Sequence, residues 1–95
     1  MKSIENKTTQ IKNAEGFMTY ADLIKIVCEQ PLQGGYSMTD IEQRLAIKKA
    51  CDKAEATIEI EDLRLAYLKS ICATSKWGAV HEDLLLFGEY IKELK

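Results

Sequence analysis

The stretch from Ser37 to Trp77 most constrains the fold, because it holds two helical patterns whose apolar side chains lie on more than one face. A helix that is apolar on two sides needs two neighbours to cover it. The residues between the two patterns, Thr57–Ile60, alternate polar and apolar side chains and include two β-branched isoleucines, which predicts a short extended link. We therefore expect helices that pack against each other and against a second chain.

The chain is 95 residues long, which is enough for one domain near the lower limit at which a single hydrophobic core is self-sufficient. Residues 1–16 are polar, and their few apolar side chains fit neither a helical nor a strand period. We predict a flexible tail over residues 1–16 and a single helical domain over residues 17–95.

Capping motifs and apolar spacing predict four helices. They extend from the N-cap Thr19 to Pro31, from the N-cap Ser37 or Thr39 to Ala54, from Glu61-Asp62 to Trp77-Gly78, and from Glu82-Asp83 towards the C-terminus. The predicted fold class is therefore all-α. We expect a compact bundle of four short helices with a polar N-terminal tail and a short extended link at Thr57-Ile60.

The two middle helices are each predicted to have two apolar sides. The sides of the second helix are Met38, Ile41 and Leu45, and Ala46, Ile47, Ala50, Cys51 and Ala54. The sides of the third helix are a main stripe of Ile60, Leu63, Tyr67 and Ile71, and a second stripe of Leu65, Leu68 and Cys72.

The residues that could support catalysis or metal binding lack the necessary spacing. Cys28, Cys51 and Cys72 fall singly in three predicted helices, whereas a structural zinc site usually presents two ligands within two to four residues. His81 lies beside two carboxylates that could orient its ring, but no nucleophile accompanies it at a defined spacing. A thiolate at Cys72, within an apolar stripe, is disfavoured by desolvation. We predict reduced thiols, no metal, no cofactor and no enzymatic activity.

The charge and hydropathy of the chain indicate no membrane association and no general attraction to phosphate. The net charge is −2, and the longest apolar run, Leu84 to Phe87, is too short to span a bilayer. The N-terminus has neither the continuous apolar segment nor the cleavage site of a secretory signal. A cytoplasmic location is the resulting expectation.

Three apolar or aromatic residues fit least well into a monomeric core: Tyr36, Trp77 and Leu85. Exposed aromatic and leucine side chains that cluster mark contact sites. The alternative for Trp77 is that it closes one end of the bundle. We predict a protein–protein interaction module that binds through these residues to itself, as a homodimer, or to another protein.

A second hypothesis is a small nucleic-acid-binding or transcriptional regulator. Its phosphate contacts would be Arg44, Lys48, Lys49 and Lys53, the basic residues of the second predicted helix. Acidic neighbours dilute this strip, and the third predicted helix opens with Glu61-Asp62, which repels phosphate. Nucleic acid is therefore the less favoured partner.

The layout of the chain resembles that of small uncharacterised proteins encoded by tailed phages and prophages. The residues that carry the resemblance are Gly35-Tyr36-Ser37-Met38-Thr39-Asp40-Ile41, Arg44-Leu45-Ala46-Ile47, Ile58-Glu59-Ile60-Glu61-Asp62 and Leu65-Ala66-Tyr67-Leu68-Lys69. The resemblance covers about residues 17 to 93 and implies a phage-derived accessory or assembly protein with a phage or host protein as its partner. It implies no site residues.

Overall fold

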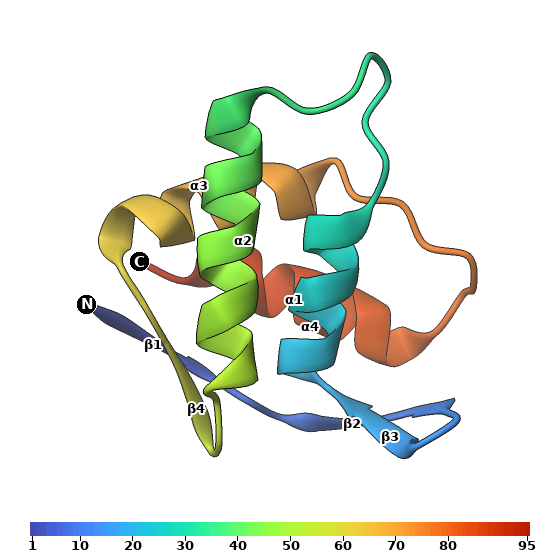
Figure 1. Ribbon diagram of the computed structural model, residues 1–95. Helices are drawn as coiled ribbons and strands as arrows, with labels where there is room; N and C mark the ends of the chain where they lie inside the picture. Colours follow the sequence, from blue (N-terminus) through green and yellow to red (C-terminus); the bar gives the residue numbers. More distant parts are fainter.

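The computed structural model describes residues 1–95 and contains four helices and four short strands (Figure 1). In chain order the elements are β1 (Lys2–Glu5), β2 (Thr8–Asn13), β3 (Gly16–Thr19), α1 (Tyr20–Glu29), α2 (Met38–Asp52), β4 (Thr57–Ile60), α3 (Asp62–Ala73) and α4 (Glu82–Glu93). The strands form two antiparallel pairs, β1 with β4 and β2 with β3, so the fold is mixed α and β. The prediction of an all-α helical bundle is therefore wrong.

The N-terminal segment is held by strand pairing. In the β1–β4 pair Ile4 lies opposite Ile58, and both side chains are buried in the core. The β2–β3 hairpin turns at Ala14-Glu15, and β3 begins at Gly16, whose φ of 127° is a conformation that only glycine adopts readily. The prediction of a flexible tail over residues 1–16 is wrong as well.

The physical reason for both errors is that β1 depends on a distant partner. β1 contributes a single buried side chain, Ile4, and one inward residue produces no period-two pattern. Its hydrogen-bonding partner, Thr57–Ile60, lies more than 50 residues further along the chain. The extended conformation of Thr57–Ile60 and the burial of its two isoleucines are confirmed.

Capping motifs fix the starts of the first two helices. The Thr19 hydroxyl accepts a hydrogen bond from the Asp22 N–H at 3.3 Å, and the Asp22 carboxylate accepts one from the Thr19 N–H at 2.9 Å. Ser37 and Asp40 form the same capping box at the start of α2, so Ser37 and not Thr39 is the N-cap. α2 and α3 both end earlier than predicted.

The predicted main stripe of α3 is wrong at Leu63, whereas Ile60 is buried and Tyr67 and Ile71 pack against the core. Leu63 is 80% exposed, whereas Leu65 and Leu68, assigned to the second side, are buried. β4 enters α3 with Ile58 and Ile60 already in the core, which fixes the rotation of the helix that follows. A helical-wheel projection of the sequence shows two apolar sides of α3 but does not show which residues face the core.

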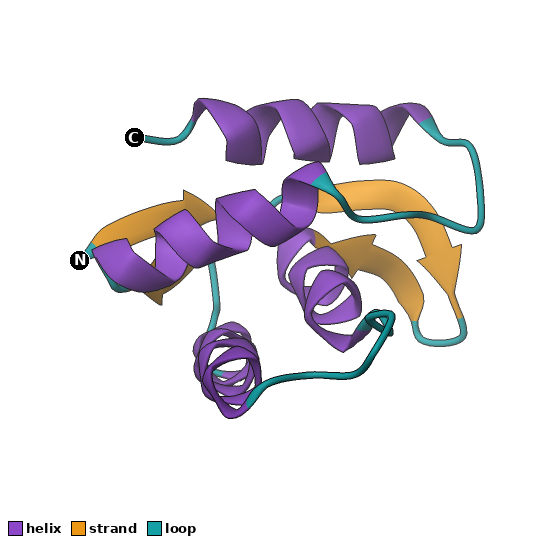
Figure 2. Cartoon of the chain, turned by 90° about the horizontal axis from the view of Figure 1, so that it is seen from above, coloured by secondary structure: helices purple, strands orange, loops and turns teal.

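The helices are arranged around α3. Seen from above, α4 lies on one side of α3, and α1 and α2 lie on the other, so α2 and α4 are on opposite sides of the molecule (Figure 2). The two strand pairs lie together at one end, and the loop between α1 and α2 lies at the other end (Figure 1). One hydrophobic cluster of 15 buried residues contains side chains from all four helices and from β1 and β4, and Ile11 of β2 and Met18 of β3 pack against it.

Candidate functional site

Arg44, on α2, is buried and reaches across to two other helices. Its side chain has only 5% exposure. Nη1 donates hydrogen bonds to the carbonyl oxygens of Val27, at 3.2 Å, and Cys28, at 3.0 Å, near the C-terminal end of α1. Nε donates to the Tyr67 hydroxyl of α3 at 3.1 Å. Arg44 thus donates to carbonyl groups at the end of α1, of which that of Val27 also accepts from the Gln30 N–H, and links α2 to both neighbours.

The hydrogen-bond chain continues from Tyr67 back to α2. The Tyr67 hydroxyl donates to the Asp40 carboxylate at 2.9 Å. Burial, followed by this hydrogen bond, raises the pKa of Tyr67 above its ordinary value. Hydrogen bonds from the Ser37 hydroxyl and backbone N–H, followed by the one from Tyr67, lower the pKa of Asp40. The network therefore holds a neutral tyrosine between a carboxylate and a guanidinium.

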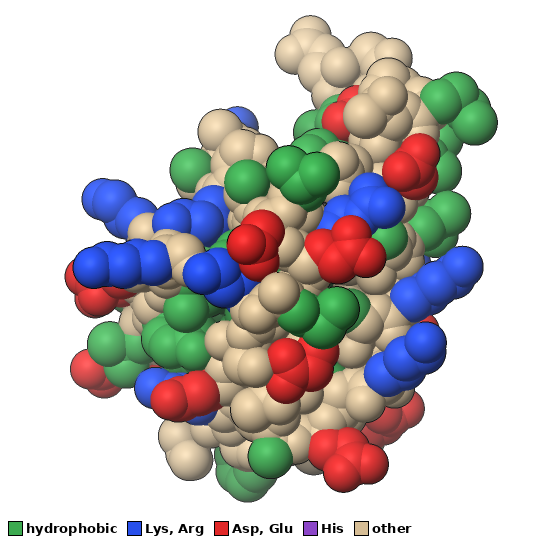
Figure 3. Space-filling model, turned by 90° about the vertical axis from the view of Figure 1, so that its left-hand side faces the viewer, with side chains coloured by type: hydrophobic (Ala, Val, Ile, Leu, Met, Phe, Trp, Pro, Cys, Tyr) green, Lys and Arg blue, Asp and Glu red, His purple; other side chains and the backbone are tan.

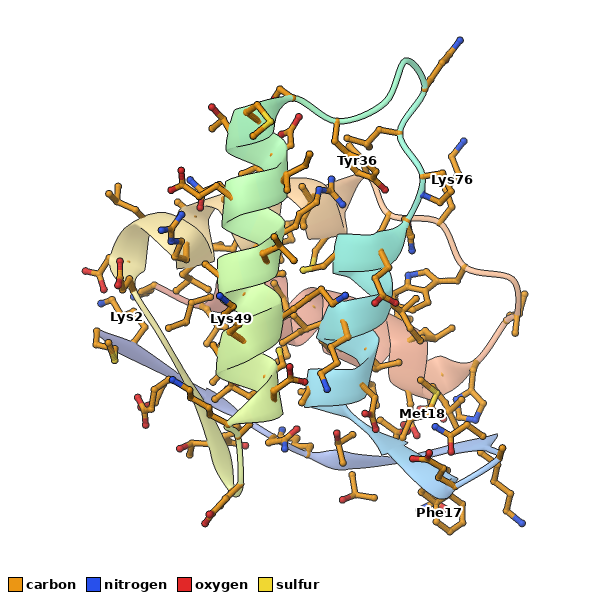
Figure 4. All side chains as sticks on the ribbon, viewed as in Figure 1. Lys2, Phe17, Met18, Tyr36, Lys49 and Lys76 are labelled. Carbon is orange, nitrogen blue, oxygen red and sulfur yellow. The ribbon has the colours of Figure 1, made fainter.

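Two loops close over this network. The Tyr36 ring lies 5.0 Å from the Arg44 guanidinium carbon, and the Tyr36 hydroxyl donates to the Gln30 carbonyl. The Gln30 side-chain amide donates to the Lys76 carbonyl at 2.7 Å and accepts from the Lys76 N–H at 3.0 Å. Tyr36 and Lys76 come from separate loops and lie at the same end of the molecule (Figure 4).

A cavity of about 680 Å³ opens beside the network. Its charged lining residues are Asp40, Arg44 and Lys76. Both Asp40 oxygens already accept hydrogen bonds from the chain, and the Ser70 and Ser75 hydroxyls donate to carbonyls of α3. Most polar groups here are thus bonded within the chain, and the arrangement resembles a polar core that is open on one side.

The outer face of α2 has a different character. Met38, Ile41 and Leu45 follow one another at helical spacing and are 80%, 39% and 49% exposed. A smaller hollow of about 230 Å³ borders Ile41 and Leu45, with Tyr36 and the stem of Lys48 on its other sides. The predicted apolar patch of Met38, Ile41 and Leu45 therefore lies at the surface, where the chain covers it only in part.

The three predicted contact residues do not form one surface. Tyr36 lies beside the outer face of α2 and is 38% exposed. Trp77 is half-buried, and its ring packs edge-to-face against Phe87 with 6.2 Å between the ring centroids. This position is the one expected if Trp77 packs within the monomer and does not serve as a contact residue. Leu85 is 63% exposed on α4, which lies on the opposite side of the molecule from α2 (Figure 2). The stripe of Met38, Ile41 and Leu45 is visible in the sequence but was not among the predicted contact residues.

The four predicted phosphate-binding residues are also divided. Arg44 is turned into the protein, and Lys48 is paired with Glu29 at 2.5 Å. Lys49 and Lys53 are exposed and have no ion pair within the chain. On the face shown in Figure 3, Lys and Arg side chains lie in separate groups with Asp and Glu between them. The structure thus presents no continuous basic strip along α2.

The thiols and the histidine occupy structural positions. Burial raises the pKa of Cys28 to about 11 and the pKa values of Cys51 and Cys72 to about 12, and all three cysteines are free. His81 is the N-cap of α4, and its Nδ1 accepts a hydrogen bond from the Asp83 N–H at 3.0 Å. No three His, Cys, Asp or Glu residues are grouped so that they could hold a metal ion. Neither the thiols nor the histidine are arranged as a nucleophile and a base.

Comparison with known proteins adds no assignment. Neither a protein-family model nor a curated protein matches this chain, and no solved structure matches it. No helix combines the length and the hydropathy that are needed to cross a lipid bilayer. The outer face of α2 is the candidate functional site that the chain's own geometry favours.

Proposed function

We propose that this chain is a non-enzymatic protein–protein interaction module that forms a homodimer through the outer face of α2. The observation that carries the proposal is the uncovered stripe of Met38, Ile41 and Leu45 on a helix whose other face is in the core. Apolar side chains that follow one helix face in this way are typical of helix-to-helix recognition. Arg44 and Ser37 hold α2 rigidly, so the stripe is presented in one orientation.

A second copy of the chain is the partner that fits this face best. In the first half of α2 the exposed charge is Glu42, and in the second half it is Lys49, with Lys53 next to it as the C-cap; Lys48 and Asp52 are paired with residues of α1. A surface whose charge changes sign along a helix is complementary to itself when two copies of the helix meet antiparallel.

The dimer should be weak. α2 has 15 residues, so the contact is about 22 Å long, and three large apolar side chains lie along it. Such a contact falls at the small end of specific interfaces, and we expect a dissociation constant of about 10 to 100 μM.

Sedimentation equilibrium over about 5 to 500 μM tests the proposal. The wild-type chain should approach the dimer mass at the upper end of this range, and Leu45→Glu should remain a monomer. Leu63→Glu is the matched control, because Leu63 is also exposed but lies on α3, and it should dimerise like the wild type. A wild-type chain that stays monomeric throughout would overturn the proposal, and so would a Leu45→Glu variant that dimerises normally.

Leu85→Glu separates this surface from the contact site that the sequence suggested. It should dimerise like the wild type, because α4 lies on the opposite side of the molecule (Figure 2). Loss of the dimer in Leu85→Glu alone would assign the contact to α4 and not to α2.

The biological setting that we propose is an accessory or assembly role in the cytoplasm of a cell that carries a phage or prophage. The resemblance in layout to phage-encoded proteins supports the setting, and three unpaired thiols are typical of a reducing compartment. Neighbouring genes test it: phage structural genes would support an assembly role, and a setting without phage genes would contradict it.

A further inference from the structure

We propose that the two copies of α2 pair antiparallel across a two-fold axis beside Leu45, so that Glu42 of each copy faces Lys49 of the other. This inference rests on the proposed homodimer and specifies its geometry. Three features of α2 carry it: the position of Leu45, the placement of the charges, and the freedom of the two charged side chains.

Leu45 lies between Glu42 and Lys49 along the helix. Glu42 precedes it by three residues and Lys49 follows it by four. Seven residues make nearly two turns, so Glu42 and Lys49 lie on the same flank of the apolar stripe. When two copies cross antiparallel at Leu45, Glu42 and Lys49 of opposite copies come to nearly the same height on that flank. Each dimer then has two such pairs.

The direction of pairing follows from the charges. A parallel pair has its two-fold axis along the helices, so the flank with Glu42 and Lys49 in one copy would meet the opposite flank of the other, and these two residues could not pair across the contact. An antiparallel pair brings the two flanks together, so each Glu42 can attract a Lys49, and it also opposes the two helix dipoles favourably. Only the antiparallel arrangement allows contact between the apolar stripes together with pairing of Glu42 and Lys49.

Glu42 and Lys49 are free to make this contact. Lys49 is exposed and has no ion pair in the chain, and it lies on the lower half of α2 in the view of Figure 4. The Glu42 side chain is 72% exposed, and its ion pair with Arg64 is 3.4 Å long. Exposed ion pairs of this kind contribute little, so Glu42 can exchange Arg64 for a lysine of the second copy at small cost. Lys48, in contrast, is held by Glu29.

A charge-reversal series tests the geometry by sedimentation equilibrium. Glu42→Lys and Lys49→Glu should each weaken dimerisation about tenfold, because each turns two attractions into two repulsions. The combined variant Glu42→Lys with Lys49→Glu should return to within about twofold of the wild type, since both pairs are restored with reversed sign. Glu89→Lys, an exposed reversal on α4, is the control and should dimerise like the wild type.

The outcomes separate this inference from the proposal on which it rests. If Leu45→Glu abolishes the dimer but the single reversals have no effect, α2 forms the interface and the antiparallel pairing is wrong. If the combined variant is as weak as the single ones, Glu42 and Lys49 do not face each other and the inference is overturned. If the wild-type chain does not dimerise at all, the proposed function fails and this geometry fails with it.

Discussion

The two faces of α2 have similar residues and different roles. The inner face contains Ile47 and Cys51, which are buried against α1, α3 and β4, together with Arg44, which is hydrogen-bonded to α1 and α3. The outer face contains Met38, which is 80% exposed, and Ile41, which is 39% exposed. One face of α2 is thus buried within the monomer, and the other face is exposed to solvent.

The difference shows that burial, and not residue type, decides what an apolar side chain does here. Ile47 and Ile41 are both isoleucines on α2, six residues apart, yet Ile47 is 1% exposed and Ile41 is 39% exposed. An inner substitution should therefore change the free energy of unfolding, and an outer one should change association. The predictions that follow test this division.

The largest expected effect is that of Ile47→Ala. Removing a fully buried isoleucine side chain should lower the free energy of unfolding by about 2 to 4 kcal/mol, through lost transfer free energy and the cavity left behind. Ile41→Ala, the matched change on the outer face, should cost less than about 0.5 kcal/mol in the monomer. Urea unfolding at a concentration where the chain is monomeric measures both. Similar losses for the two variants would show that the faces are not distinct.

The next effect belongs to the polar part of the inner face. Arg44→Met keeps a long side chain but leaves the Cys28 carbonyl and the Tyr67 hydroxyl without this donor, and leaves the Val27 carbonyl with the Gln30 N–H alone. We expect a loss of about 2 to 3 kcal/mol in the same urea experiment, because unsatisfied buried polar groups are costly. Lys49→Met, an exposed cation removed from the same helix, is the control and should change stability by less than about 0.5 kcal/mol. An Arg44→Met variant as stable as this control would contradict the structural role of the network.

The helices could be predicted from the sequence because their signals are local. The capping boxes of Thr19 with Asp22 and of Ser37 with Asp40 can be recognised within four residues, and the structure contains both. The strand β1 could not be predicted, since its stability depends on pairing with Thr57–Ile60 at the other end of a long loop of chain. Patterns within a few residues contain no information about pairing between strands that are far apart in the sequence.

The candidate site was predictable only in part, for the same reason. The apolar spacing of Met38, Ile41 and Leu45 is visible in the sequence, but whether another helix covers it depends on the packing of the whole chain. The position of Arg44 was equally hidden, because an arginine on a helix usually faces solvent. Its inward orientation follows from the end of α1 and from Tyr67, which the chain brings together only on folding.

The smallest expected effect concerns Cys51, on the inner face, and its dependence on pH. Burial raises the pKa of the Cys51 thiol from its ordinary value of 9.0 to about 12 in the folded chain. Well below pH 9 the thiol is protonated in both states, and stability is unaffected. Above pH 9 the unfolded chain loses this proton while the folded chain keeps it, so stability must fall as pH rises towards 12.

By pH 10 the Cys51 contribution should reach about 1.4 kcal/mol relative to pH 8, one tenfold change in the unfolding equilibrium. Cys51→Ala removes this group and retains the other two thiols, so its stability should decline less steeply over the same interval. Urea unfolding of both chains at pH 8, 9 and 10 measures the difference in slope, and any constant cost of the substitution cancels. Identical slopes would mean that the thiol ionises in the folded chain as readily as in the unfolded one, and that this part of the inner face is open to water.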